Sequence, residues 1–159
     1  MKVRTIKRGT VEARFLLAIL SLTLISVVAY AQGPMVDSDH LIQTADLAHT
    51  LQSNAQKPLI FNVGPRMLYQ QAHIVGAEYI GAGSEPNGIE ALKTRVKSVP
   101  KKQSIVLYCG CCPWSHCPNV EPAFKQLRSM GFTNVKVLFI PNNIGTDWVY
   151  KGYPTVRGQ

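Results

Sequence analysis

Cysteine is absent from residues 1–108 and from residues 118–159 of this 159-residue chain. All four cysteines, Cys109, Cys111, Cys112 and Cys117, fall within nine residues of the stretch LYCGCCPWSHCPN. A disulfide stabilises a fold most when it closes a long loop, and every bridge within this stretch would close a very short one. The cysteines therefore do not tie distant parts of the chain together, although a bridge between two of them would make their own loop rigid.

Other absences exclude further classes of function. The sequence contains no internal repeat, no dinucleotide-binding fingerprint and no phosphate-loop motif, so no organic cofactor is implied. Acidic residues are few, nine against 17 Lys and Arg. The basic residues are scattered, however, and the longest basic tract after residue 14 is Lys101-Lys102. We therefore expect no nucleic-acid partner.

The N-terminal segment is typical of a secretory signal peptide. Five basic residues precede the apolar run FLLAILSLTLISVVAY, which leads into Ala29-Tyr30-Ala31. A basic region, an apolar region and an Ala-x-Ala site together predict cleavage after Ala31. The alternative is an uncleaved anchor, but the run of 16 residues is shorter than the roughly 20 that a spanning helix needs.

Cleavage would leave residues 32–159 as a single domain without a stable membrane anchor. Removal of five basic residues and one acidic residue leaves 12 Lys and Arg against eight Asp and Glu, a net charge of +4. We expect this domain to be exported and to be periplasmic or secreted. Because disulfides persist in such compartments, the four thiols must pair, bind a metal or be kept reduced by a periplasmic reductant.

Apolar patterns along the mature chain alternate between helix and strand. Residues near helical spacing predict helices, and short apolar runs predict buried strands. The expected helices cover residues 37–54, 87–99, 118–130 and 145–153, and the expected strands cover residues 58–63, 77–80, 104–109 and 134–140. This order predicts an α/β fold with a mostly parallel central sheet and helices on both faces. Ligands in such folds bind at the carboxyl ends of the strands, where Cys109 is expected.

Four segments, in this order, resemble the rhodanese-like domain family of the sulfurtransferase superfamily. They are LIFNVGPRMLYQQAHIVGAEYI, IVLYC, LRSMGFTNVKVL and NIGTDWVYKGYP, and the resemblance extends from Leu41 to Pro154. It implies a three-layer domain and a sulfurtransferase, in which Cys109 takes a sulfane sulfur from a small donor as a persulfide and passes it to a thiol acceptor. His73 and Gly76 match the structural His-Ile-x-Gly-Ala motif.

The sequence departs from the family pattern at two places. The usual Asp-x-Arg is Asn62-Val63-Gly64, for which Arg66 is a candidate partial substitute. The usual loop carries Arg or Lys at the fifth position after the nucleophile, where this chain has Trp114. The interval from Cys109 to Gly131 is also longer than is usual in the family, which indicates an enlarged loop that contains the added cysteines.

The loop has features that suit a reactive thiol. A thiolate is the nucleophilic form, and backbone N–H groups at a helix N-terminus favour it. Gly110 would let the backbone bend closely around Cys109. Trp114, Ser115 and His116 are candidate pocket residues, and His116 is the only candidate cation in the loop.

Two alternatives remain open from the residues alone. One is a thiol–disulfide redox protein, because Cys109-Gly-Cys-Cys112 is a Cys-x-x-Cys sequence. In a sulfurtransferase too, Cys111, Cys112 or Cys117 would be a resolving thiol that releases the sulfur as it forms a disulfide. The other alternative is a non-enzymatic Cu⁺ or Zn²⁺ site, with Cys109, Cys111, Cys112, Cys117 and His116 as candidate ligands.

Overall fold

The computed structural model describes residues 36–158, so the predicted signal peptide over residues 1–31 lies outside the described residues. The helices are η2 (Ser38–His40), α2 (Thr44–Gln52), α3 (Arg66–Gln71), α4 (Pro86–Arg95), η3 (Trp114–His116), α5 (Val120–Ser129) and the π-helical η4 (Gly145–Val149). The strands are β1 (Leu41–Gln43), β2 (Leu59–Asn62), β3 (His73–Ile74), β4 (Ala77–Tyr79), β5 (Ile105–Tyr108), β6 (Val135–Phe139) and β7 (Thr155–Val156).

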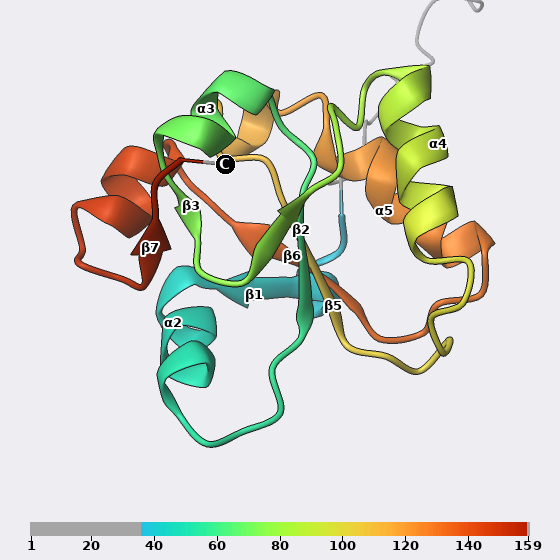
Figure 1. The fold of residues 1–159 in the computed structure, drawn as a ribbon, viewed down its shortest axis with the longest axis horizontal. Helices are drawn as coiled ribbons and strands as arrows, with labels where there is room; N and C mark the ends of the chain where they lie inside the picture. Colours follow the sequence, from blue (N-terminus) through green and yellow to red (C-terminus); the bar gives the residue numbers. More distant parts are fainter. Residues whose placement is uncertain (1–35, 159) are drawn as a thin grey trace, which may run out of the picture. The chain divides into compact units, whose positions relative to one another are not determined.

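Five strands form one parallel sheet in the order β1-β6-β5-β2-β4 (Figure 1). Strand β5 lies at its centre, where Leu107 pairs with Phe61 of β2 and with Val137 of β6. Strands β3 and β7 form a separate antiparallel pair. The mostly parallel α/β architecture expected from the sequence is confirmed.

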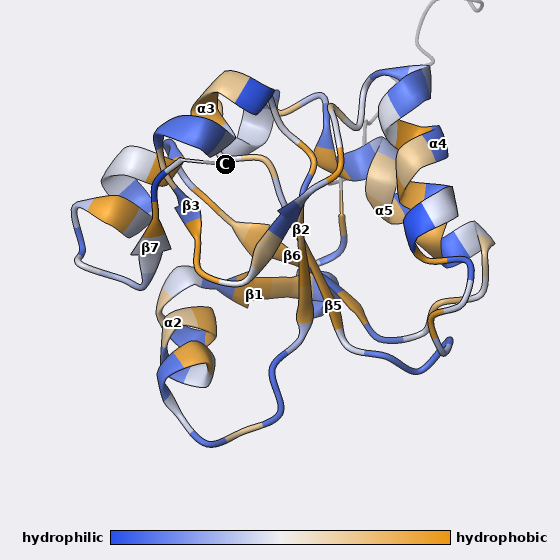
Figure 2. Ribbon diagram, viewed as in Figure 1, coloured by the Kyte–Doolittle hydropathy of each residue, from blue (hydrophilic) through white to orange (hydrophobic). Residues whose placement is uncertain are grey.

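Helices cover both faces of the sheet. Ile105 and Leu107 of β5 pack in one apolar cluster with residues of α4 and α5. Val106 and Tyr108 point to the other face, into a cluster with residues of α2, α3 and η4. Figure 2 shows the corresponding pattern, with apolar strands inside and polar residues on the outer sides of the helices. Because side chains alternate along a strand, Cys109, directly after β5, belongs to the α4 and α5 side.

The structure corrects two predicted helices. The helix expected over residues 37–54 begins only at Thr44, because Leu41–Gln43 form the edge strand β1 that hydrogen-bonds to β6. The helix expected over residues 145–153 is the five-residue η4. The segments that form α3, β3 and β7 were not assigned to elements from the sequence, because each is short.

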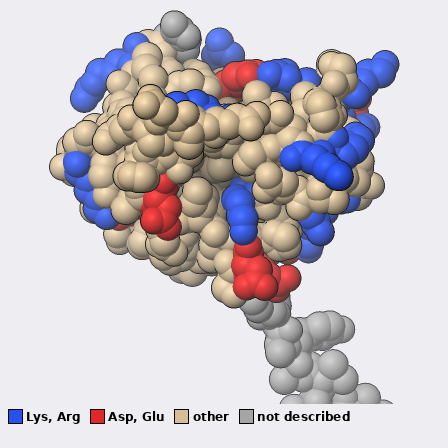
Figure 3. Space-filling model, turned by 90° about the horizontal axis from the view of Figure 1, so that it is seen from below, with Lys and Arg blue, Asp and Glu red and all other residues tan. Residues whose placement is uncertain are grey.

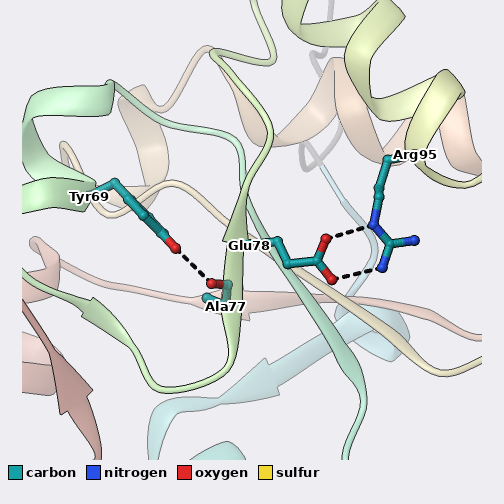
Figure 4. Close-up of polar contacts among 4 residues, drawn as sticks. All are labelled: Tyr69, Ala77, Glu78 and Arg95. Carbon is teal, nitrogen blue, oxygen red and sulfur yellow. Dashed lines mark hydrogen bonds and ion pairs between the residues drawn. The ribbon is translucent and has the colours of Figure 1, made fainter. Parts of the chain in front are cut away.

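Polar contacts fix strand β4 against its neighbours (Figure 4). Glu78 of β4 accepts two hydrogen bonds from Arg95 at the end of α4, at 2.6 and 2.7 Å. The hydroxyl of Tyr69 in α3 donates to the carbonyl of Ala77 at 2.7 Å. These contacts join an edge strand of the sheet to helices on both of its faces.

The charged residues form no single continuous patch on the face in Figure 3, where Lys and Arg are dispersed among uncharged residues. Within residues 36–158, no helix has the length and apolar character that a membrane span requires.

Candidate active site

Cys109 lies where the central strand ends, enclosed by backbone on two sides. Its side chain is 4 % exposed. On one side, a Cβ at Gly64 would lie 2.8 Å from the carbonyl oxygen and 3.0 Å from the sulfur of Cys109. On the other side, Gly110 has φ +78° and accepts a hydrogen bond from the amide of Ile144. The bend predicted at Gly110 is therefore present, and it turns the loop away from the sheet directly after the thiol.

The loop brings three of the sulfurs together. The sulfurs of Cys109, Cys111 and Cys117 all lie within 4.8 Å of one another. The Cys109 and Cys111 sulfurs are 3.0 Å apart, and the Cys111 and Cys112 sulfurs are 3.1 Å apart. Cys117 is buried like Cys109, whereas Cys111 and Cys112 are half-buried, and all four are free thiols. The cluster thus has a buried pair and a more accessible pair.

Asn119 is the polar partner of the Cys109 sulfur, and no sequence pattern indicated it. Its side-chain amide donates to the Cys109 sulfur at 3.3 Å. Its carbonyl oxygen accepts from the amide and the hydroxyl of Ser84, at 3.1 and 2.8 Å. Because the two Ser84 bonds occupy the oxygen, they fix which end of the amide faces the sulfur. Asn119 therefore presents an N–H group, which favours an anionic sulfur at Cys109.

The thiols of Cys109 and Cys117 have pKa values that are shifted in opposite directions. The pKa of Cys117 is lowered to about 6, first by the hydrogen bond from Cys109 and then by the backbone amides of Asn119 and Val120 at the start of α5, against the opposing effect of burial. The pKa of Cys109 is raised well above its ordinary value by the same hydrogen bond to Cys117 and by burial. The two thiols therefore titrate as a pair, and the directions of their pKa shifts favour the negative charge on Cys117 over Cys109.

The more accessible thiol Cys112 differs from this pair. Burial and the neighbouring Cys111 raise its pKa to about 12. Its sulfur contacts the carbonyl of His116 at 3.6 Å. Cys112 is therefore a neutral thiol in the resting protein, and it is less nucleophilic than Cys117.

The other predicted loop residues lie farther out. Trp114 is half-buried with its ring edge against Phe139, at 5.7 Å between centroids. Ser115 and His116 are exposed and contact each other, with 2.8 Å between the Ser115 hydroxyl and Nδ1 of His116. The ring of His116 is thus engaged at the surface and is not grouped with the three clustered sulfurs.

The residues of the two sequence motifs have structural contacts. His73 is buried, and its ring stacks on Tyr69, with Nδ1 2.8 Å from the Tyr69 carbonyl oxygen. Gly76 turns the chain between β3 and β4 with φ +76°. Asn62, at the place of the usual Asp, is buried and donates to the carbonyl of Cys109 at 3.4 Å. Arg66 lies over the ring of Tyr79, 5.2 Å from its centroid.

A pocket of about 380 Å³ opens beside the cluster. Cys111 and Gly110 form one wall, and Asn143, Ile144 and Arg157 are among the other lining residues. Among the lining residues that the structure describes, Arg157 is the only Lys or Arg. It follows β7, whose Val156 pairs with His73, and precedes Gly158, whose amide donates to Gln70. No sequence pattern indicated Arg157, because only the β3–β7 pairing brings it to the pocket.

The comparisons with known proteins agree with this architecture. The family model described as rhodanese-like domain matches residues 44–139, more than half of the chain. No curated protein matches the chain.

Several solved structures share the fold. The crystal structure of the Alr3790 protein from Anabaena sp. is 25% identical with a TM-score of 0.57, covering 74% of this chain and 92% of that one. A solution structure of the rhodanese-like domain of the same Anabaena protein is 24% identical with a TM-score of 0.55, covering 74% and 79%. The BH2092 protein from Bacillus halodurans is 18% identical with a TM-score of 0.58, covering 92% and 85%.

Proposed function

The chain belongs to the rhodanese-like domain family, and from this premise we propose that it is an exported sulfurtransferase that carries sulfane sulfur as a persulfide on Cys109. One observation carries the proposal: Cys109 directly follows the central parallel strand, and its sulfur has a hydrogen-bond donor, one thiol at 3.0 Å and a second thiol within 4.8 Å. A buried thiol that only fills space needs none of these partners.

Cys117 provides a base for the first step. The proton of Cys109 passes to the Cys117 sulfur. Because the pKa of Cys109 lies above that of Cys117, this transfer is uphill and is completed only as the Cys109 sulfur forms its new bond. The Cys109 sulfur attacks the sulfane sulfur of a donor such as thiosulfate. The S–S bond of the donor breaks, and sulfite leaves with the bonding electron pair. The product is a Cys109 persulfide anion, to which Asn119 donates a hydrogen bond.

The sulfur can leave Cys109 by two routes, and Cys111 takes part in the second. An external thiol acceptor can attack the terminal sulfur, which transfers that sulfur and returns Cys109 as a thiol. Without an acceptor, the Cys111 sulfur, 3.0 Å from that of Cys109, attacks the inner sulfur of the persulfide. This forms a Cys109–Cys111 disulfide and expels hydrosulfide. A dithiol reductant in the same compartment then reduces the disulfide to two thiols.

Arg157 supports the binding of an anionic donor. The family pattern has a cation in the loop, and this chain has Trp114 there. Arg157 comes from another part of the chain and lines the same pocket as Cys111. We assign to it the attraction of the anionic end of a small sulfur donor.

Mass spectrometry tests the proposal. The reduced protein is incubated with thiosulfate or with polysulfide, and its mass is measured before and after addition of dithiol. Cys111→Ser cannot resolve the persulfide to a disulfide, so we expect this variant to gain one sulfur atom and the wild type to release hydrosulfide. The gain should be lost when Cys109→Ser is added and kept when Cys112→Ser, the matched control, is added. A Cys111→Ser protein that gains no sulfur from either donor would refute a carrier function.

The short Cys109–Cys111 distance also favours a second candidate, a thiol–disulfide redox protein. In that case the oxidised wild type would lose two hydrogen atoms without release of hydrosulfide, and Cys111→Ser would gain no sulfur. Export is tested separately, by expression of the full chain in a bacterial host. The proposal predicts that the protein in the periplasmic fraction or medium begins at Gln32.

A further inference from the structure

We propose that the sulfurs of Cys109, Cys111 and Cys117 form a three-coordinate site for Cu⁺. The three residues come from separate parts of the site: Cys109 directly follows β5, Cys111 lies in the loop and Cys117 precedes α5. Their sulfurs nevertheless lie within 4.8 Å of one another. This site goes beyond sulfur transfer, because it needs no donor and no persulfide.

The spacing of the sulfurs suits a metal. With a metal–sulfur bond of about 2.3 Å, three sulfurs around a planar trigonal ion lie about 4 Å apart. All three pairs fall within the 4.8 Å limit, and the Cys109–Cys111 pair at 3.0 Å must open by about 1 Å to reach the trigonal spacing. Cys111 can make this movement, because it is half-buried in a loop. Cys109 and Cys117 are buried and fixed by the ends of β5 and α5.

The number and kind of ligands favour Cu⁺ over Zn²⁺. Structural zinc sites are almost always four-coordinate, and the five candidate ligands predicted from the sequence would have been enough for one. The structure groups only three of them. Cys112 contacts the His116 carbonyl, and the His116 ring contacts Ser115. Three thiolates with no nitrogen or oxygen ligand suit a soft monovalent ion.

The surroundings can hold the negative charge of a Cu⁺ trithiolate. Asn119 donates an N–H to the Cys109 sulfur, and Ser84 fixes its orientation. Such hydrogen bonds to ligand atoms orient them and tune the metal. A small cavity beside the sulfurs is lined by Cys109, Cys112 and Cys117, and its other lining residues include Val120 and Ile140, which are both buried. The ion would therefore have apolar neighbours on its buried side, with Cys111 as the ligand that faces the outer pocket.

Copper and sulfane sulfur would compete for the same atom. Cu⁺ at this site occupies the Cys109 sulfur that the carrier mechanism uses as a nucleophile. The metal-free protein would load sulfur, and the copper form would not. Cu⁺ would thus be a second ligand of this site, and its binding can be measured separately from persulfide loading.

The test uses Cu⁺ itself. The reduced mature protein is titrated anaerobically with Cu⁺ against a chromogenic Cu⁺ chelator, with Zn²⁺ in parallel. We expect one tightly bound Cu⁺ per chain, and X-ray absorption with three sulfur ligands at about 2.3 Å. Loss of a contact that supports a metal ligand lowers metal affinity by up to roughly 100-fold. Cys111→Ser and Cys117→Ser remove a ligand itself, so they should weaken Cu⁺ binding by more than that. Cys112→Ser and His116→Ala are the matched controls and should bind as the wild type does.

Three outcomes would overturn the site: no competition with the chelator, tighter binding of Zn²⁺ than of Cu⁺, or a loss in Cys112→Ser as large as in Cys111→Ser. Cys111 is half-buried, so its variant keeps the test valid if Cys117→Ser does not fold. Circular dichroism checks the fold of each variant. Persulfide loading of the metal-free protein is measured separately, so a failure of the copper site leaves the sulfurtransferase proposal intact.

Discussion

Replacement of Asn119 with alanine should lower both the stability of the domain and the formation of a persulfide. The change removes two hydrogen bonds to Ser84 and one to the Cys109 sulfur. A neutral hydrogen bond contributes about 1 kcal/mol net, so loss of the two Ser84 bonds should cost about 2 kcal/mol of unfolding free energy. A bond to a charged group contributes about 1.5–3 kcal/mol. At about 1.4 kcal/mol per factor of ten, loss of the bond to a Cys109 persulfide anion should reduce loading by roughly 10- to 100-fold.

Two companion variants separate these effects. Ser84→Ala removes only the hydroxyl bond to Asn119 and should cost about 1 kcal/mol, with a small effect on loading. Asn119→Asp keeps an acceptor for Ser84 but places a negative oxygen against the Cys109 sulfur. It should therefore reduce loading at least as much as alanine does. Urea unfolding measures stability, and mass spectrometry with thiosulfate measures loading. Loading of Asn119→Ala at the wild-type rate would refute the role of this amide.

Three further predictions follow from the site. The pKa of Cys117 is lowered to about 6, so its thiolate contributes stability that is present above the unfolded pKa and is lost as pH falls through 6. The ultraviolet absorbance of the thiolate should fall over the same pH range in the reduced protein. This absorbance should be missing in Cys117→Ser. Arg157→Ala should raise the KM for thiosulfate about fivefold, as expected for an exposed charge worth about 1 kcal/mol. It should leave the KM for a neutral organic trisulfide unchanged. The control Arg66→Ala should change neither KM. Gly64→Ala should lower the unfolding free energy measured in urea by about 1–3 kcal/mol through overpacking, and it should reduce persulfide loading. Gly152→Ala is the control, because a Cβ there has open space although φ is positive. It should reduce stability only.

The sequence was sufficient for the parts of the fold that depend on local pattern. The apolar run that contains β5 and the punctuated segment that forms α5 were both predicted, because burial on two faces and helix boundaries leave local signals. The edge strand β1 was merged into the following helix. Its apolar residues continue the helical spacing, and only pairing with β6 draws them into the sheet. Such pairing depends on a segment about a hundred residues away, which no local pattern reports.

The site residues also differ in whether they could be predicted from the sequence. Cys109 was predictable because a parallel sheet places ligand sites where its strands end. Asn119 was not, since its role depends on Ser84, which is 35 residues away in the chain and reaches it only in the fold. Arg157 was missed for a similar reason, because the β3–β7 pairing brings it to the pocket. Contacts made by single side chains across the fold carry no periodic signal.

Position in the fold also distinguishes the three added thiols from one another. Cys117 precedes α5, and the backbone amides of Asn119 and Val120 stabilise a negative charge on its sulfur, so it suits the acceptance of a proton. Cys111 lies between the buried pair and the pocket, so it suits release of sulfur or the outer ligand of a metal. Cys112 contacts Cys111 but stands outside the three-sulfur group. If these positions determine function, the single serine variants should differ in kind: loss of the resting thiolate at Cys117, loss of hydrosulfide release at Cys111, and neither at Cys112.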